Sequence, residues 1–334
     1  VIVVALAFAL GVLVLYNVDL RGVVRQILGA RPAWLALALV TMIVNLALRA
    51  WRWQYLLEPI GRPTFGNAFR ATAVGFAASA VLPARAGEII RPYFLSRREH
   101  LSATGAFATI ILERVLDMLT VLVLLAVYVF FLRDDIAPGA VGAFNTVTWM
   151  AGTAAFVSLL VLGALVLLAR DPAQLARTLS RLERVLPSAL AGLLAVVAQK
   201  FAEGLAVVRR PSRLFVALAL SLPLWLSIAA GIWTVAMAFR LAMSFAGSFL
   251  IMALLVVGVA APTPGAVGGF HYAFKFGATT FFGARDDAAV GAAIVLHAFT
   301  LLPSLLLGLG FAAQEGLNLA GMKQLAEREE RGAA

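Results

Sequence analysis

The stretch "AVLPARAGEIIRPYFLSRR", residues 80–98, interrupts an otherwise almost continuously apolar chain with prolines, a glycine and charges. Arg85, Glu88 and Arg91 follow Pro83 within two helical turns. A charge at membrane depth costs about 2.5–3.5 kcal/mol on insertion scales, so each charge must be paired, hydrated or functional. Irregular backbone at that depth is tolerated only where it is buried in protein or lines a wet cavity. The stretch therefore predicts a helix that is broken within a membrane protein, beside a polar site.

The composition is that of an integral membrane protein. Of 334 residues, 62% are hydrophobic and 13% are charged, whereas an ordinary soluble domain has about 25% charged residues. The mean hydropathy of +0.96 leaves no room for a soluble catalytic domain. The formal charge of +10 is explained by Lys and Arg in cytoplasmic loops, so we expect no nucleic-acid partner. The absence of cysteine excludes disulfides and thiolate chemistry.

Sustained apolar runs near 20 residues predict helices that cross about 30 Å of hydrocarbon. We expect six of them, at about 1–16, 33–57, 105–132, 146–169, 214–239 and 288–312. These runs predict an all-α polytopic membrane protein with one transmembrane domain over residues 1–320. Residues 321–334 are expected to form a charged cytoplasmic tail.

Two further apolar runs, 71–82 and 246–261, end at proline-containing breaks and resume as second short helices. At 1.5 Å per residue the first run reaches about 18 Å, roughly half of the bilayer. The breaks share the pattern P-x-x-x-G, as "PARAG" at 83–87 and "PGAVG" at 264–268. We therefore predict two re-entrant helical hairpins within an internal repeat, whose halves cover about 33–132 and 214–312.

The orientation follows from the densest basic stretch of the chain, residues 171–212, which we expect in the cytoplasm. Leucines at three- and four-residue spacing, with arginines off that line, predict an amphipathic helix on the inner leaflet there. The first hairpin then enters the membrane from the cytoplasm and the second from outside. The predicted repeat is therefore inverted, as in many transporters that work by alternating access.

The first break has the features of an anion site. It frees backbone N–H groups at the start of the next half-helix, and Arg85 and Arg91 lie close to that end. The planar guanidinium suits phosphate oxygens better than an ammonium group does. Glu88 is expected to orient one arginine while the other binds the anion.

Glu113 and Asp117 lie four residues apart on the next predicted helix and therefore share one face, while Arg114 is rotated by about 100°. Two interpretations are open. Neighbouring carboxylates in a low dielectric tend to share a proton, which suits a proton relay. Alternatively, they neutralise Arg85 or Arg91 as counter-charges and hold the hairpin in place.

The second break, "APTPGAVGGFHYAFKF" at 261–276, has no acidic residue. His271 and Lys275 lie four apart on its second half-helix. With the freed amides of Gly268 and Gly269 they are candidates for the opposite wall of the anion site. The alternatives are a polar packing role for His271 and, for Lys275, snorkelling to the outer interface.

The sequence predicts no cofactor, metal ion or catalytic residue. His297, in the middle of a predicted helix, has no ligand pattern around it. The glycines of the second break, Gly265 among them, match neither the P-loop nor the dinucleotide-binding pattern, so no nucleotide is expected.

The motifs also carry a resemblance. "PARAGEIIRPYFL" at 83–95, "LERVLD" at 112–117 and "PTPGAVGGF" at 262–270 resemble those of the flippase-like membrane family. That family includes the integral membrane domain of lysylphosphatidylglycerol synthase, the bacterial multiple peptide resistance factor. The resemblance runs from "RAWRWQYLL" at Arg49 to the last helix and implies a lipid translocation domain. By motif, it implies functional roles for Arg85, Glu88, Arg91, Glu113, Arg114, Asp117, Pro264, Gly265, Gly268 and Gly269.

Two departures from the family pattern matter. The second motif ends in "GGFH", where the family pattern has an acidic residue. No soluble acyltransferase-like domain follows the last helix, so the chain resembles the stand-alone members and is not expected to synthesise an aminoacyl lipid.

The leading hypothesis is a lipid flippase that holds an anionic, phosphate-bearing headgroup between the two breaks. Candidate substrates are an anionic phospholipid, an aminoacyl-phosphatidylglycerol and a polyprenyl-phosphate lipid; candidate partners are a lipid-synthesis enzyme and a second copy of the chain. The alternatives are an intramembrane lipid-modifying enzyme and a structural membrane subunit of a lipid-synthesis partner. We expect a multi-pass protein of a bacterial-type inner (plasma) membrane.

Overall fold

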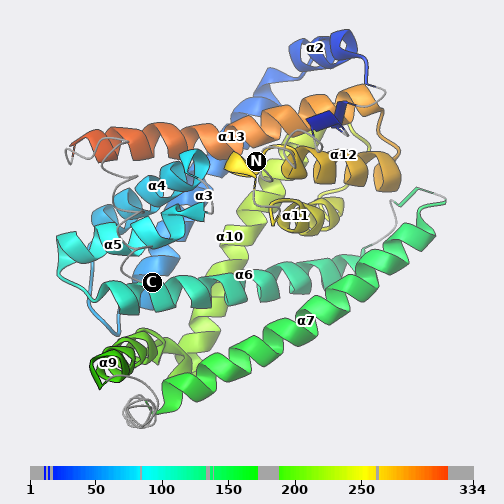
Figure 1. Ribbon diagram of the computed structural model, residues 1–334. Coiled ribbons are helices and arrows are strands. Elements are labelled where there is room, and N and C mark those ends of the chain that lie inside the picture. The colour runs from blue at the N-terminus through cyan, green and yellow to red at the C-terminus, as the bar shows by residue number, and fades with distance from the viewer. Residues whose placement is uncertain are drawn as a thin grey trace.

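The computed structural model describes residues 11–12, 14–15, 18–82, 85–132, 136–137, 139–171, 188–260 and 263–314, and within these ranges its regular elements are helices (Figure 1). The longer helices are α2 (Leu20–Leu28), α3 (Pro32–Leu57), α4 (Phe65–Val81), α5 (Gly87–Glu99), α6 (Ala103–Phe131), α7 (Val141–Arg170), α9 (Ser188–Gly204), α10 (Pro211–Ala238), α11 (Gly247–Gly258), α12 (Gly269–Phe282) and α13 (Asp286–Gln314). Two short 3-10 helices, η3 (Ala206–Arg209) and η4 (Pro264–Ala266), connect them.

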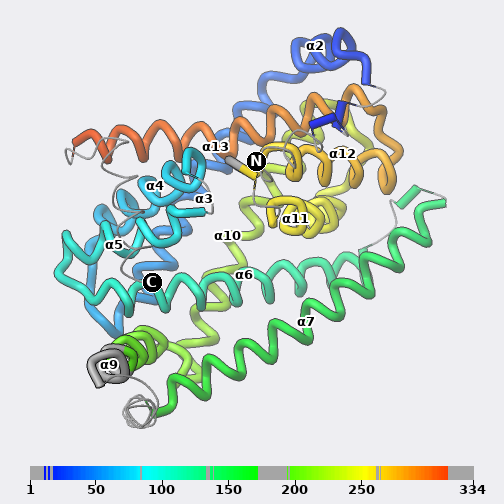
Figure 2. The backbone as a smooth tube through the Cα atoms, in the orientation of Figure 1, coloured from blue at the N-terminus to red at the C-terminus, as the bar shows by residue number. Residues whose placement is uncertain are grey.

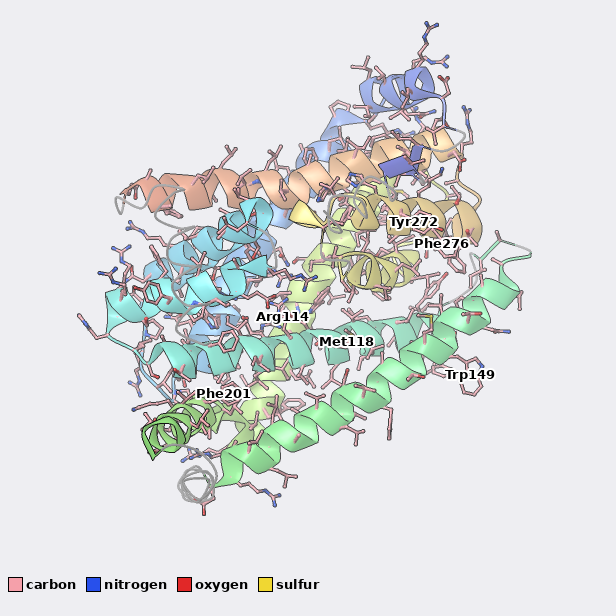
Figure 3. All side chains as sticks on the ribbon, viewed as in Figure 1. Arg114, Met118, Trp149, Phe201, Tyr272 and Phe276 are labelled. Atoms are coloured by element: carbon pink, nitrogen blue, oxygen red, sulfur yellow. The ribbon has the colours of Figure 1, made fainter. Side chains whose placement is uncertain are left out.

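Four of these helices, α3, α7, α10 and α13, are long and apolar enough to cross a membrane. The outermost is α7, whose Trp149 is 80% exposed and points away from the protein (Figure 3). A large apolar side chain in that position is stable in hydrocarbon and unfavourable in water. Helix α6 is as long as these four but carries Glu113, Arg114 and Asp117 near its middle. The architecture is that of an all-α polytopic membrane protein.

The predicted helices agree closely with the observed bounds of α3, α6, α7, α10 and α13. The first arm of the first hairpin differs. Helix α4 begins at Phe65 because Thr64 caps it, its side chain accepting a hydrogen bond from the backbone N–H of Asn67. With 17 residues it is about 25 Å long and not 18 Å. The predictions for most of 1–16, for Pro83 and Pro262, for the amphipathic leucines and arginines of 171–187 and for the tail lie outside the described residues.

The two hairpins, α4 with α5 and α11 with α12, lie between α6 and α13 (Figure 2). Each of these two long helices contacts both hairpins: α6 packs against α5 and α11, and α13 packs against α12 and α4. Helices α3 and α10 pack extensively against each other. Helix α13, which follows the second hairpin, therefore packs on the first, and α6, which follows the first hairpin, packs on the second. This arrangement brings the two breaks to the centre of the molecule.

Small residues let the two arms of each hairpin approach closely. A Cβ atom added to Gly75 of α4 would lie 2.7 Å from the Cβ of Arg91 on α5, and one added to Gly258 of α11 would lie 2.6 Å from the Cβ of Ala273 on α12. Real Cβ atoms do not come this close, so both crossings require glycine. Glycine at such crossings is common between helices in membranes, where close backbone packing replaces the hydrophobic effect.

Candidate functional site

A cavity of about 660 Å³ lies between the two hairpins and receives residues of both breaks. This volume is within the range of roughly 300–1,000 Å³ that is usual for small-molecule sites. The charged side chains in its wall are Arg49, Arg85, Glu88, Arg91, Arg114 and Asp117. Four arginines against two carboxylates make the cavity electropositive. We refer to it as the cationic cavity.

Arg52 of α3 is the centre of a buried charge cluster next to this cavity. Its side chain is fully buried, and its Nη1 donates to Asp117 Oδ1 at 2.6 Å and to Ser221 Oγ at 2.8 Å. Its Nη2 donates to Glu113 Oε1 at 3.2 Å. One guanidinium thus joins both carboxylates of α6 to α3 and α10. Removing one partner of such a buried ion pair leaves the other charge uncompensated, which generally costs about 3–5 kcal/mol.

Arg91 of α5 completes the cluster from the other side. Its Nη1 donates to Glu113 Oε2 at 2.7 Å, and its guanidinium carbon lies 3.8 Å from the ring centroid of Trp53. Its Nε and Nη2 are buried and have no hydrogen-bond partner among the described residues. Arg91 is therefore a fixed cation that belongs to the cavity wall and keeps unused donors.

Asp117 connects the buried cluster to the arginines of the cavity. Its Oδ1 also accepts a hydrogen bond from Trp225 Nε1 at 2.8 Å. Its Oδ2 lies 3.6 Å from Arg114 Nη2 and 4.0 Å from Arg49 Nη1. Arg114 in turn lies 4.0 Å from Glu88. These contacts support the counter-charge role of Glu113 and Asp117, while the proton relay stays a prediction.

Arg85 connects the two breaks directly. It is exposed, has a left-handed backbone with φ of 55°, and donates from Nη2 to the carbonyl oxygen of Val259 at the end of α11. The last carbonyls of a helix carry partial negative charge and no partner within the helix, so they attract a cation. Arg85 reaches across the cationic cavity from one hairpin to the other.

The second break contributes other residues to the described cavity wall than the sequence predicted: Thr263, Ala266 and Phe270 line it, and of the predicted set Gly265 does. Gly265 is part of the wall, together with His297 of α13, whose Nε2 lies 2.8 Å from the Gly265 carbonyl oxygen. Gly268, Gly269 and His271 are not in the described wall. The backbone N–H of Gly268 donates to His271 Nδ1 at 3.4 Å, and the His271 ring packs against that of His297.

Lys275 lies away from the cationic cavity. Its Nζ donates to the backbone carbonyl of Val14 at 3.1 Å and lies 3.7 Å from Asp286 Oδ2. The four-residue spacing predicted that His271 and Lys275 share one helix face of the anion site. In the described residues neither side chain belongs to the wall of the cationic cavity.

Two arginines of the site, Arg49 and Arg52, were missed as site residues by the sequence reasoning. Both come from "RAWRWQ" in the second half of an apolar run. The signal was present, because a charge inside a predicted spanning helix is a candidate functional residue. Their partners, on α6 and α10, are distant in the chain and carry no local signature.

Comparison with known proteins agrees with the helical architecture. Residues 1–308 match the family described as the lysylphosphatidylglycerol synthase TM region. The glycosyltransferase AglD of Haloferax volcanii is 33% identical over 135 residues, which are 39% of this chain and 22% of that protein. The UPF0104 membrane protein MJ1595 of Methanocaldococcus jannaschii is 25% identical over 133 residues, 39% of this chain and 37% of that protein. These matches span well under half of either relative. The family match covers nearly the whole chain, and the chain therefore belongs to the family of the lysylphosphatidylglycerol synthase transmembrane region.

Proposed function

We propose that this protein moves an anionic, phosphate-bearing lipid between the leaflets of the plasma membrane, with the headgroup held in the cationic cavity. Membership in the family of a lipid synthase's membrane region supports a lipid-related function. The observation that carries the proposal is the cavity itself, with four arginines and two carboxylates in its wall between two broken helical hairpins. A charged cavity of this kind inside an apolar bundle is costly to keep unless it serves a polar ligand.

The charge balance favours an anion. Arg52 and Arg91 compensate Glu113 and Asp117 in the buried cluster. Glu88 is the remaining carboxylate of the cavity wall, and the same wall holds three further arginines: Arg49, Arg85 and Arg114. The excess positive charge is matched by a phosphate, whose oxygens accept the paired donors of a guanidinium.

Arg85 is suited to receive the headgroup first, because it is exposed and its hydrogen bond within the described residues goes to a neutral carbonyl. A phosphate oxygen is a stronger acceptor for a guanidinium than the Val259 carbonyl is. In the proposed cycle the headgroup displaces that carbonyl and then contacts Arg49 and Arg114, while the hydrocarbon stays in the bilayer. The substrate class includes anionic phospholipids, aminoacyl-phosphatidylglycerol and polyprenyl-phosphate lipids, supplied by a lipid-synthesis enzyme.

A liposome assay tests the proposal. Purified protein is placed in phosphatidylcholine vesicles that contain a trace of fluorescent phosphatidylglycerol or fluorescent phosphatidylcholine, and outward movement is measured by quenching of the outer leaflet. We expect movement of the anionic probe only, lost in Arg85→Gln and kept in the matched control Arg97→Gln, since Arg97 is an exposed arginine of α5 outside the cavity wall.

Phosphatidylglycerol movement no faster than in protein-free vesicles would contradict the proposal. A chemically altered lipid, detected by mass spectrometry of the same vesicles, would instead support an intramembrane enzyme. A pH gradient applied across the vesicles tests the proton relay separately: acceleration that disappears in Asp117→Asn would support it, and equal rates with and without the gradient would argue against it.

A further inference from the structure

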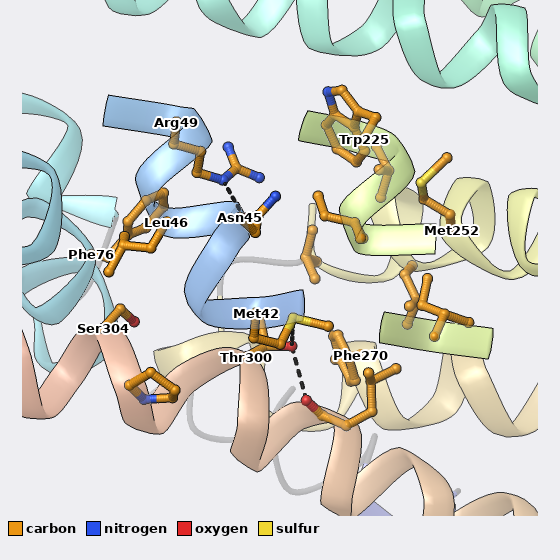
Figure 4. A pocket seen from close by; sticks show the side chains of 17 residues that line it. Met42, Asn45, Leu46, Arg49, Phe76, Trp225, Met252, Phe270, Thr300 and Ser304 are labelled. Carbon is orange, nitrogen blue, oxygen red and sulfur yellow. Dashed lines mark hydrogen bonds between the residues drawn. The ribbon is translucent and has the colours of Figure 1, made fainter. Parts of the chain in front are cut away.

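A second, smaller cavity of about 190 Å³ adjoins the cationic cavity (Figure 4). It lies between α3, α10, α11 and α13 and has a largely apolar wall. The side chains found only in its wall, and not in that of the cationic cavity, include Met42, Leu46, Ile228, Ile232, Met252 and Leu255. We call it the apolar annex. The site described above makes no use of it.

Arg49 stands at the junction of the two cavities. It belongs to both walls, as do Phe76 and Trp225, and its side chain is 14% exposed. The guanidinium carbon lies 5.4 Å from the Phe76 ring centroid and 5.8 Å from that of Trp225. A guanidinium near two aromatic faces is held by cation–π attraction and has its donors in a fixed plane.

A relay of hydrogen bonds fixes the orientation of Arg49. Its Nε donates to Asn45 Oδ1 at 3.0 Å, the contact drawn in Figure 4. The amide nitrogen of Asn45 donates to the Leu224 carbonyl and to Ser227 Oγ, both at 3.0 Å. Within the described residues no hydrogen bond is found for the Nη atoms of Arg49, and Nη1 lies 4.0 Å from Asp117 Oδ2, beyond hydrogen-bonding distance. Arg49 is thus preorganised, with its Nη donors left for a ligand.

We infer that Arg49 binds the phosphate of an anionic lipid and that the apolar annex takes the first part of the hydrocarbon chain of the same molecule. This inference rests on the proposed function and assigns two parts of its substrate to two parts of the site: the phosphate to Arg49 and the hydrocarbon next to it to the annex. Phosphate and chain are joined covalently, so a phosphate at a buried arginine needs apolar space beside it for the attached carbons. The annex adjoins Arg49 and supplies that space.

The annex acts through its space and not through hydrophobic attraction. A hydrocarbon chain that leaves the bilayer for an apolar cavity exchanges one apolar environment for another and gains little. Filling the annex should therefore exclude the lipid sterically while the positive charge of the cationic cavity is unchanged. Ile228→Trp places a large ring in the annex. Leu222→Trp is the matched control, because Leu222 lies on the same helix, is 39% exposed and contributes to neither cavity.

The test uses vesicles of phosphatidylcholine with a phosphatidylglycerol photoprobe whose diazirine lies next to the ester carbonyl. After irradiation, the labelled peptides are identified by mass spectrometry, and lipid movement is measured in a parallel sample. We expect labelling of α3, α10 and α11 around Met42, Ile228 and Met252, and none of it from a matched phosphatidylcholine probe. Arg49→Gln should reduce this labelling about tenfold or more, the effect of one lost hydrogen bond to a charged group.

Ile228→Trp should abolish both the labelling and phosphatidylglycerol movement, whereas Leu222→Trp should change neither. Movement that continues at the wild-type rate in Ile228→Trp would overturn the annex inference and leave the proposed function standing. Equal labelling of the annex by the phosphatidylcholine probe would overturn the selection of an anionic lipid, and unchanged labelling in Arg49→Gln would overturn the role of Arg49. Wild-type protein that neither moves nor binds phosphatidylglycerol would overturn the proposed function first and the annex inference with it.

Discussion

The two hairpins cross in the same way but place different side chains at the crossing. In each hairpin a glycine of the first arm faces the second: Gly75 meets Arg91, and Gly258 meets Ala273. The second arm of each also ends in a left-handed residue, His100 after α5 and Gly283 after α12. The equivalent position that carries a buried arginine in the first hairpin carries a methyl group in the second.

This difference separates the packing of the helices, which we call the frame, from the charged side chains that form the site. The frame depends on small residues and tight turns, which both hairpins have. The charged side chains are concentrated in α3, the first hairpin and α6, where Arg52 and Arg91 pair with Glu113. The second hairpin adds backbone carbonyls, from Val259 to Arg85 and from Gly265 to His297. Two similar frames can therefore form one electropositive cavity without equal shares of charge.

The largest effect is expected from removing the centre of the charge cluster. Arg52→Met leaves Glu113 and Asp117 without their shared buried partner, so we expect a loss of about 3–5 kcal/mol in the free energy of unfolding. Denaturation in mixed micelles measures it, with the exposed Arg62→Met as the control. A loss of only about 0–1 kcal/mol, the usual contribution of a surface ion pair, would mean that the charge cluster does not stabilise the fold.

The shared frame predicts equal costs in the two hairpins. Gly75→Ala and Gly258→Ala each introduce a Cβ atom too close to the opposite arm, and we expect each to lower the free energy of unfolding by about 1–3 kcal/mol. Gly163→Ala in α7 is the control, because a Cβ there meets nothing within 4 Å. A large cost in one hairpin and none in the other would break the comparison.

The second break should respond more weakly than the charge cluster. His297→Phe keeps a ring that can stack on Phe270 but removes the hydrogen-bonding partner of the Gly265 carbonyl, a loss of about 1 kcal/mol. His271→Phe should cost less, since its hydrogen bond to the Gly268 N–H is long at 3.4 Å. Unfolding in the same micelles measures both losses. A larger loss in His271→Phe than in His297→Phe would contradict this ranking.

The smallest effect concerns the open end of the first hairpin, where α4 begins and α5 ends, and depends on pH. Burial acts to raise the pKa of Glu99, but hydrogen bonds from Asn67 and Thr64 outweigh it and leave the pKa below its ordinary value of 4.5. The stabilisation is therefore present above pH 4.5 and is lost as the pH falls through the lower pKa of the folded state.

The unfolding temperature measures this effect. Glu99→Gln should lower it slightly at pH 7, and the difference from wild type should shrink as the pH falls below 4.5. A difference that stays constant down to the lowest pH at which the protein remains folded would show that the charge of Glu99 contributes nothing.

Local sequence patterns predicted most of the helices and those site residues that lie together on α6. Runs of apolar residues predicted the bounds of α3, α7, α10 and α13 to within a few residues, because a spanning helix is recognised from the hydropathy of consecutive residues. The spacing of Glu113 and Asp117 placed both on one face, and both bind Arg52 there. The cap at Thr64, which lengthens α4, was a local signal that hydropathy alone overlooked.

The sequence by itself determined the membrane class of this protein, the order of its long apolar helices and the positions of its two breaks. Only the tertiary structure decided which arginine pairs with which carboxylate, that Arg49 stands between two cavities, and that Lys275 lies away from both. The physical reason is distance along the chain: Arg52 and Ser221 are 169 residues apart and hydrogen-bonded at 2.8 Å. Such a contact depends on how α3, α6 and α10 pack, and helix packing in a membrane is set by close fit and polar pairing, not by hydropathy.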